Sequence, residues 1–394
     1  MAREVVVVSG VRTAIGDYGG SLKDIAPTQL GAICVKEAVS RAKIDPAAVG
    51  HVVFGSVIHG EARDMYLSRV AAIEGGLPVG TPCLTVNRLC GSGLQAIVSA
   101  SQHILLGDVD VAIGAGTESM SRAAYFIPAA RWGQRMGDAQ LVDAMTGALH
   151  DPFGNGHMGV TAENIAAKFG MTREEQDAFS LESHRRAAKA LDAGHFKSQI
   201  VPVEMKSKKG PVRFDTDEHV RKDAKIEDFQ KLKAAFKKEG GTVTAGNASG
   251  INDAAAAVVL MEKSAAERQG AKPLARLVAY AHAGVEPQLM GLGPIPAVKR
   301  VFEKAGLKPA DMDVIESNEA FAVQAMAVTR DLGLDPAKVN PNGGAVALGH
   351  PIGATGCILT VKALYELQRT GKRHALVTMC IGGGQGIAAI FERM

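Results

Sequence analysis

Short apolar stretches alternate along the chain with longer amphipathic ones, and this alternation sets the expected secondary structure. The apolar stretches predict buried strands at residues 4–9, 51–57 and 110–114, whereas residues 30–42 and 90–106 predict helices. We place the glycine-rich Gly114-Ala115-Gly116 at the end of the third strand. Strands that alternate with helices indicate an α/β architecture.

The same succession of elements returns near the C-terminus. Residues 36–46 can be laid over residues 299–309 at an offset of 263 residues. Further on, Gly107 before one strand matches Gly371, before a strand predicted at residues 375–379, at an offset of 264 residues. An offset this steady indicates two copies of one α/β domain, related by a pseudo-twofold axis.

The segment between the two copies matches neither of them. It is more polar, shows an amphipathic helix pattern at residues 174–193, and has twelve Lys or Arg against seven Asp or Glu over residues 197–238. We therefore expect residues 1–120 and 271–394 to be repeated halves and residues 121–270 to be a loop or lid domain. The basic excess could attract a phosphorylated ligand, or it could be an ordinary solvated surface.

Composition limits the classes of function. A chain of 394 residues, 46% hydrophobic and 22% charged, is typical of a globular protein with two or three domains. The formal net charge of +3 is too small to indicate nucleic acid or a membrane as a partner. No apolar run is long enough to span a bilayer, and the chain opens directly on a strand pattern without a targeting segment. We expect a cytoplasmic protein.

The five cysteines are Cys34, Cys83, Cys90, Cys357 and Cys380. Their odd number and their lack of metal-type pairing argue against a disulfide framework and against a zinc site. A reducing compartment fits this pattern, and we expect no bound metal.

Cys90 is a candidate nucleophile. It is followed by Gly91-Ser92-Gly93 at the predicted start of a helix, where the helix dipole and free N–H groups can lower a thiol pKa. The alternative is a buried structural cysteine. By the repeat offset, His350 lies just ahead of the equivalent helix start in the second copy, so the pseudo-twofold would bring a candidate base towards Cys90.

Two further motifs follow predicted strands near the C-terminus. Cys380-Ile381-Gly382-Gly383-Gly384 would leave backbone N–H groups free for an oxyanion, whereas a dinucleotide-binding loop would need a helix and a second strand after it, for which no chain remains. Asn318, after a strand predicted at residues 313–315, could hold a water or donate to an oxyanion. It could equally cap the following helix.

Together these motifs carry a specific resemblance. Cys90-Gly-Ser-Gly, Asn318-Glu-Ala-Phe, Gly349-His350-Pro-Ile-Gly-Ala and Cys380-Ile-Gly-Gly-Gly, in this order, resemble the signature of the thiolases. The resemblance covers the whole chain and is closest to the bacterial biosynthetic type. It implies a thiolase-like fold with two α/β halves, each with a mixed central sheet, plus an inserted loop domain.

The resemblance also implies roles for the motif residues. Cys90 would take the acyl group from acyl-CoA while His350 accepts the thiol proton. Cys380 would then remove a proton from the methyl group of acetyl-CoA, and the carbanion would attack the acyl-cysteine. One oxyanion would be held by His350 and a water on Asn318, and the other by the backbone N–H groups of Cys90 and Gly382.

The partners implied are acetyl-CoA, acyl-CoA and coenzyme A, with coenzyme A as a substrate and product and no tightly bound cofactor. Coenzyme A would lie along the insert, and Met158 and Met290 would line the acyl pocket. The other residues implied at the coenzyme A site are Ser249, Arg221, His157, Phe236, Ala245 and Phe321. The family implies a homotetramer, for which we assign the added contact to residues 121–145.

Several alternatives stay open at the level of the sequence. The reaction could serve biosynthesis, for example of polyhydroxyalkanoate precursors, or the degradative thiolysis of fatty-acid β-oxidation. A decarboxylating ketosynthase shares the fold but pairs its cysteine with two histidines, or with a histidine and an asparagine; the presence of Cys380 rather than a second histidine favours the thiolase. A coenzyme A- or lipid-carrying protein and a papain-like hydrolase are further possibilities, although the latter lacks its usual sequence around the cysteine.

Overall fold

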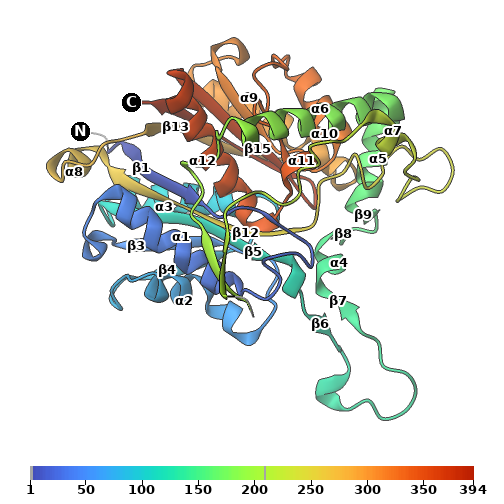
Figure 1. The fold of residues 1–394 in the computed structure, drawn as a ribbon, viewed down its shortest axis with the longest axis horizontal. Helices are drawn as coiled ribbons and strands as arrows, with labels where there is room; N and C mark the ends of the chain where they lie inside the picture. The colour runs from blue at the N-terminus through green and yellow to red at the C-terminus, as the bar shows by residue number, and fades with distance from the viewer. Residues whose placement is uncertain (1–2, 208–209) are drawn as a thin grey trace.

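In the computed structural model, which describes residues 3–207 and 210–394, the strands of both halves join in one mixed sheet (Figure 1). Its strand order is β4-β3-β5-β12-β1-β13-β16-β15-β14. The first half contributes β1 (Val5–Arg12), β3 (His51–Gly55), β4 (Cys83–Val86), β5 (Val111–Ser119) and β12 (Asn252–Glu262). The second half contributes β13 (Ala275–Gly284), β14 (Val314–Ser317), β15 (His374–Ile381) and β16 (Gln385–Arg393).

The two halves repeat one topology, which confirms the predicted repeat and fold class. In the first half, β1 pairs with β12 and β12 with β5 in antiparallel fashion, and β5 pairs with β3 in parallel. In the second half, β13, β16, β15 and β14 repeat this order and these directions. The register repeats as well, because His51 pairs with Ala112 and Val314 with Ala375, both 263 residues further along.

Helices cover the sheet on both faces. Those of the first half are α1 (Pro27–Ala42), α2 (Leu67–Glu74) and α3 (Ser92–Leu106), followed after β12 by the short α8 (Lys263–Arg268). Those of the second half are α9 (Pro294–Ala305), α10 (Ala322–Asp331), α11 (Ala345–Leu348) and α12 (Ile352–Thr370). No helix in the described part of the chain combines the length and the apolar character needed to cross a bilayer.

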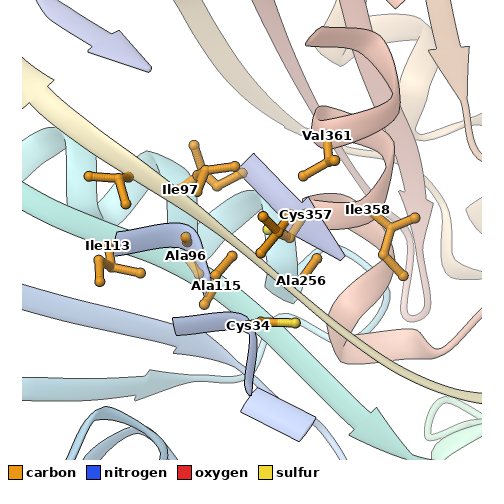
Figure 2. Packing of buried hydrophobic residues seen from close by; sticks show 14 of the residues in the cluster. Cys34, Ala96, Ile97, Ile113, Ala115, Ala256, Cys357, Ile358 and Val361 are labelled. Atoms are coloured by element: carbon orange, nitrogen blue, oxygen red, sulfur yellow. The ribbon is translucent and has the colours of Figure 1, made fainter. Parts of the chain in front are cut away.

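The central helices α3 and α12 meet without side chains between them at their N-terminal ends. A Cβ on Gly93 would lie 2.7 Å from the backbone nitrogen of Cys357, and one on Gly356 would overlap the backbone of Leu94. Around this contact the core is built from small and β-branched residues, among them Ala96 and Ile97 of α3 and Cys357 of α12 (Figure 2). The glycines therefore set how closely the two helix starts approach.

Strand β5 continues through Gly114 and Gly116 to Ser119, so the expected strand end at these glycines is wrong. A Cβ on Gly114 would lie 2.6 Å from Cα of Ile97, and one on Gly116 would overlap the carbonyl oxygen of Gly353. Glycine is needed here because the backbones of both central helices lie directly on the strand. The close approach of another backbone is a common reason for a glycine inside a strand.

Most of the segment 121–270 forms helices and loops over the sheet. Helix α6 (Arg173–Asp192) matches the predicted helix, and Thr172 and Glu175 form a capping box at its start. The end of this segment differs from the expectation, since β12 (Asn252–Glu262) is a central strand of the first half, between β1 and β5. The other elements of the segment are α4 (Ala144–Ala148), α5 (Met158–Phe169), α7 (Ile226–Gln230) and the hairpins β6 (Tyr125–Phe126)–β7 (Val142–Asp143), β8 (His150–Asp151)–β9 (Gly156–His157) and β10 (Val203–Ser207)–β11 (Gly210–Phe214).

A buried ion pair fastens the insert to the sheet. Arg12 at the end of β1 donates to both carboxylate oxygens of Asp217, at 2.7 and 2.9 Å, and to Oε1 of Gln199 at 2.8 Å. The side chains of Arg12 and Asp217 are both fully buried. Such a bidentate pair contributes a defined geometry as well as interaction energy, so the insert is held in one position over the core.

We predict that Gly93→Ala lowers the midpoint of thermal unfolding, because the added methyl group meets backbone atoms of α12 that cannot move aside. Overpacking of this kind costs about 1–3 kcal/mol, which exceeds the gain in helix propensity. The matched control is Gly147→Ala in α4, where no atom lies within 4 Å of the added Cβ. The prediction fails if calorimetry at one protein concentration gives both variants the same midpoint.

Candidate active site

A cavity of about 520 Å³ opens where the two halves and the insert meet. Its inner wall contains Cys90 from the loop before α3, His350 from the loop before α12, and Cys380 and Gly382 from the end of β15 and the turn after it. A second cavity of about 560 Å³, between α6 and α10, contains none of the predicted site residues. The predicted chemistry is thus brought together in one place.

The loop that carries Cys90 is sharply bent. Leu89 has a φ of 45°, a left-handed conformation that is unusual for a leucine. Side-chain hydrogen bonds support it: Asn87 Oδ1 accepts from the backbone N–H of Leu89 at 2.9 Å, and Ser92 Oγ accepts from that of Arg88 at 2.8 Å. The bend places Cys90 between the end of β4 and the start of α3, facing the cavity.

Burial controls the protonation of Cys90. Desolvation raises the pKa of its thiol to about 11, although the N–H groups of Gly382 and of Cys90 itself favour the thiolate. The expectation that the helix start lowers this pKa is therefore wrong in sign, because desolvation outweighs the backbone N–H groups. At neutral pH the residue is a thiol, and it needs a base to act as a nucleophile.

His350 is placed to be that base. Its ring is 5% exposed, and burial lowers its pKa to about 4, so the imidazole is neutral at physiological pH. Nδ1 lies 2.7 Å from Oγ1 of Thr355, and Nε2 lies 3.4 Å from Nδ2 of Asn318. The backbone N–H of His350 donates to Oδ1 of Asn252 at 2.9 Å. Both ring nitrogens and the backbone N–H of His350 therefore have a neighbouring polar group.

Cys380 closes the inner wall at the end of β15 and is fully buried. Burial raises the pKa of its thiol, and the neighbouring Cys90 raises it further. The glycines that follow form the tight turn from β15 to β16, with φ values of 79° at Gly383 and 87° at Gly384. A turn between two antiparallel strands is not a dinucleotide-binding loop, which confirms that this alternative is excluded.

Asn318 does not line the cavity but lies behind His350. Its backbone N–H donates to the carbonyl oxygen of Thr378 at 3.0 Å, which ties it to β15. Among the described residues no partner reaches its buried Oδ1, so one polar atom is free for a water or a ligand. The alternative of a helix cap is wrong, because the N-cap of α10 is Phe321.

The residues expected at coenzyme A line the same cavity towards its mouth. The rings of His157 and Phe236 stack with centroids 4.6 Å apart, and Phe321 meets Phe236 edge-on at 6.3 Å. The other members of this group in the cavity wall are Met158, Arg221, Ala245, Ser249 and Met290. These side chains give a mainly apolar channel with a guanidinium near its outer end.

Asp17 and His219 are among the lining residues that were not predicted. Nδ1 of His219 is hydrogen-bonded to Oδ1 of Asp17, and this bond holds the pKa of Asp17 below its usual range. Nδ2 of Asn252 also reaches Oδ1 of Asp17 at 3.2 Å, so the pair connects the cavity mouth to the residue that holds the backbone of His350. Asp17 and His219 lie 202 positions apart, and only the proximity of His219 to Arg221 in sequence could have drawn attention to it.

A comparison of the chain with known protein families identifies its own family. The pattern of the thiolase N-terminal domain matches residues 5–264, and that of the thiolase C-terminal domain matches residues 271–393. The chain belongs to the thiolase family.

Thiolases of known name and structure are similar over its full length. It is 69% identical to Beta-ketothiolase BktB of Cupriavidus necator and 51% identical to an acetyl-CoA acetyltransferase of Syntrophomonas wolfei, with 100% of both chains covered in each case. Among solved structures, human mitochondrial 3-ketoacyl-CoA thiolase matches with a TM-score of 0.98 and 45% identity over 100% of both chains. The same human thiolase in complex with CoA matches with a TM-score of 0.96 and 44% identity, over 100% of this chain and 98% of that one.

We predict that His350 stays neutral from pH 8 down to about pH 5, because burial moves its pKa to about 4. In the unfolded chain a histidine takes up a proton near pH 6.5, so the contribution of His350 to stability falls as pH decreases from there towards 4. Nitrogen NMR of histidine-labelled protein measures this, with the His350→Asn variant to assign the signal. A titration midpoint near 6.5 would contradict the prediction.

Proposed function

We propose that this thiolase is a β-ketothiolase, an acetyl-CoA C-acyltransferase that joins acetyl-CoA to acetyl-CoA or to a short acyl-CoA. One observation carries the proposal: Cys90, His350 and Cys380 share the wall of one cavity with the N–H of Gly382 beside the Cys90 sulfur. Two thiols and one imidazole are what a condensation through an acyl-cysteine requires.

In the first half of the reaction, Cys90 attacks the carbonyl carbon of the acyl-CoA thioester. His350 takes the thiol proton on Nε2 and returns it to the sulfur of coenzyme A as that leaves. Because the Cys90 thiol has a pKa of about 11 and His350 is neutral, the transfer of the proton accompanies the attack. The product is a thioester on Cys90.

In the second half, acetyl-CoA enters, the proton of Cys380 passes to Nε2 of His350, and the resulting Cys380 thiolate removes a proton from the methyl group of acetyl-CoA. Burial raises the pKa of Cys380, and a thiolate of raised pKa is a stronger base, as the weakly acidic methyl group demands. The carbanion attacks the acyl-cysteine, and the released Cys90 sulfur takes the proton back from His350. The reverse sequence cleaves a 3-ketoacyl-CoA with coenzyme A.

Each half develops negative charge on a thioester oxygen. The N–H groups of Cys90 and Gly382 are assigned to the oxygen of the acyl-cysteine, and His350 with Asn318 to that of acetyl-CoA. The free Oδ1 of Asn318 supports a water at that position. The loss of one such donor typically costs about 2.7–4 kcal/mol of transition-state stabilisation.

Coenzyme A is proposed to lie along the cavity, with its pantetheine arm past Ser249, flanked by His157 and Phe236 and with Phe321 nearby. Arg221 then faces the nucleotide end, where the phosphates complement the basic insert. Met158 and Met290 are assigned to the acyl pocket.

A biosynthetic role is supported by the 69% identity to Beta-ketothiolase BktB, and this identity suggests the supply of polyhydroxyalkanoate precursors, with degradative thiolysis as the alternative. The presence of Cys380 rather than a second histidine supports thiolase chemistry over that of a ketosynthase.

We further propose a cytoplasmic homotetramer assembled through residues 121–145. The loop between β6 and β7 extends away from the body of the chain (Figure 1). Large apolar side chains are exposed along it, including Trp132 at 86% and Met136 at 92%. An apolar arm of this kind favours burial against another subunit.

We predict that Cys380→Ser lowers the rate of condensation by at least about a hundredfold while Cys90 still becomes acylated, because a serine hydroxyl is a far weaker acid than a thiol and does not supply the anion that removes the methyl proton. Stopped assays with acetyl-CoA measure 3-ketoacyl-CoA, and peptide mass spectrometry measures acetyl groups on Cys90. Cys83→Ser, outside the cavity, is the control and should match the parent. Condensation by Cys380→Ser at the parent rate would refute the assignment of the base.

We predict that Trp132→Asp together with Met136→Asp converts the tetramer into dimers, because two charges replace the most exposed apolar side chains of the arm. Light scattering after gel filtration gives the mass of the assembly. Leu106→Asp, at a position 78% exposed on α3, is the control for a charge added elsewhere. A tetramer that persists in the double variant would exclude the arm as the contact.

A further inference from the structure

Thr355, in the first turn of α12, makes two hydrogen bonds with one hydroxyl group. The hydroxyl donates to the carbonyl oxygen of Pro351 at 2.8 Å, the usual bond of a helical threonine to the residue four positions before it. Nδ1 of His350 lies 2.7 Å from the same oxygen. A hydroxyl has one proton, and since Pro351 receives it, the oxygen can only accept at Nδ1.

We propose that Thr355 is a positioning residue that keeps the proton of neutral His350 on Nδ1, so that Nε2 keeps the lone pair needed to accept the thiol proton of Cys90. The proposal rests on the proposed function, in which Nε2 takes the thiol proton. On the other side of the ring, Asn318 presents its amide Nδ2 to Nε2 at 3.4 Å, which agrees with a lone pair there. Both neighbours of the imidazole thus select the same tautomer.

The burial of the ring makes this selection necessary. A neutral imidazole exists in two tautomers, and in water both are populated. In the other tautomer Nε2 would carry the hydrogen and could not accept the thiol proton, so that form is inactive in acylation. With His350 only 5% exposed, no solvent is available to hold Nδ1–H if Thr355 does not.

The same helix contains a matched control. Thr360 is fully buried in α12, and its hydroxyl donates to the carbonyl oxygen of Gly356 at 2.9 Å, which repeats the backbone bond of Thr355. Among the described residues, no histidine is hydrogen-bonded to Thr360. Thr355→Val and Thr360→Val therefore remove the same bond within the helix, but only the first removes the acceptor for His350.

The experiment compares Thr355→Val, Thr355→Ser and Thr360→Val with the parent. The rate of Cys90 acylation is measured by rapid quench and mass spectrometry over a range of acetyl-CoA concentrations, and nitrogen NMR of histidine-labelled protein reports which ring nitrogen of His350 is protonated. We expect Thr355→Val to acylate about ten- to a hundredfold more slowly, the equivalent of one unsatisfied buried donor, with an unchanged concentration dependence. Thr355→Ser should stay within about threefold of the parent, since it keeps the oxygen, and Thr360→Val should acylate normally.

Three outcomes would overturn the proposal. In the first, the parent spectrum shows the proton on Nε2, a test that needs no variant and holds even if Thr355→Val does not fold. In the second, Thr355→Val acylates at the parent rate with its proton still on Nδ1. In the third, Thr360→Val is slowed as much as Thr355→Val, which would assign the effect to the helix. If the parent itself forms no acyl-Cys90, the proposed function fails, whereas the spectrum still decides the tautomer.

Discussion

The site depends on one constraint, the contact between the N-terminal ends of α3 and α12 without any side chain between them. Gly93 and Gly356 make this contact possible, and Gly116 lets α12 lie on the neighbouring strand. Because Cys90 precedes one helix and His350 the other, the contact brings together residues that are 260 positions apart. The same packing contributes to the desolvation of both side chains. Proximity and desolvation, the two physical conditions for the chemistry, thus have the same origin.

Desolvation then sets the charge state of every group at the inner wall. It raises the pKa of Cys90 and Cys380 and lowers that of His350, so the resting site is neutral. A backbone N–H group at the N-terminus of α12 also finds its hydrogen-bond acceptor outside the helix. Its N-cap is Pro351, which has no capping side chain, and the buried carboxylate of Glu118 on β5 accepts the N–H of Gly353 at 2.8 Å. Glu118 also accepts N–H groups of residues 57 and 58 after β3, so one side chain ties the first half of the molecule to the helix that follows His350.

Much of this arrangement could be predicted from the sequence. The strand and helix periodicity gave the elements within a few residues, and the steady offset gave the repeat, from which the approach of His350 to Cys90 followed. The predictions that were wrong depended on contacts between residues that are distant in the chain. The place of β12 is set by pairing with β1, some 250 positions away, and Gly114 and Gly116 are explained only by the helices that cover them. Likewise, the sign of the Cys90 pKa shift depends on burial by residues from both halves, which no local pattern contains.

The repeat also shows how a symmetric scaffold supports an asymmetric reaction. The register of β3 on β5 and of β14 on β15 makes Cys380 the equivalent of Thr117, and residue 381 the equivalent of Glu118. In the first half these positions are structural: Thr117 donates to the carbonyl oxygen of Pro27, and Glu118 holds the start of α12. In the second half the position of Thr117 holds the second thiol. Each strand end lies beside the start of a central helix. The pseudo-twofold therefore brings equivalent positions of the two halves close together, and only some of these positions are needed for the reaction. The others remain free to fix the geometry, as Thr117 and Glu118 do.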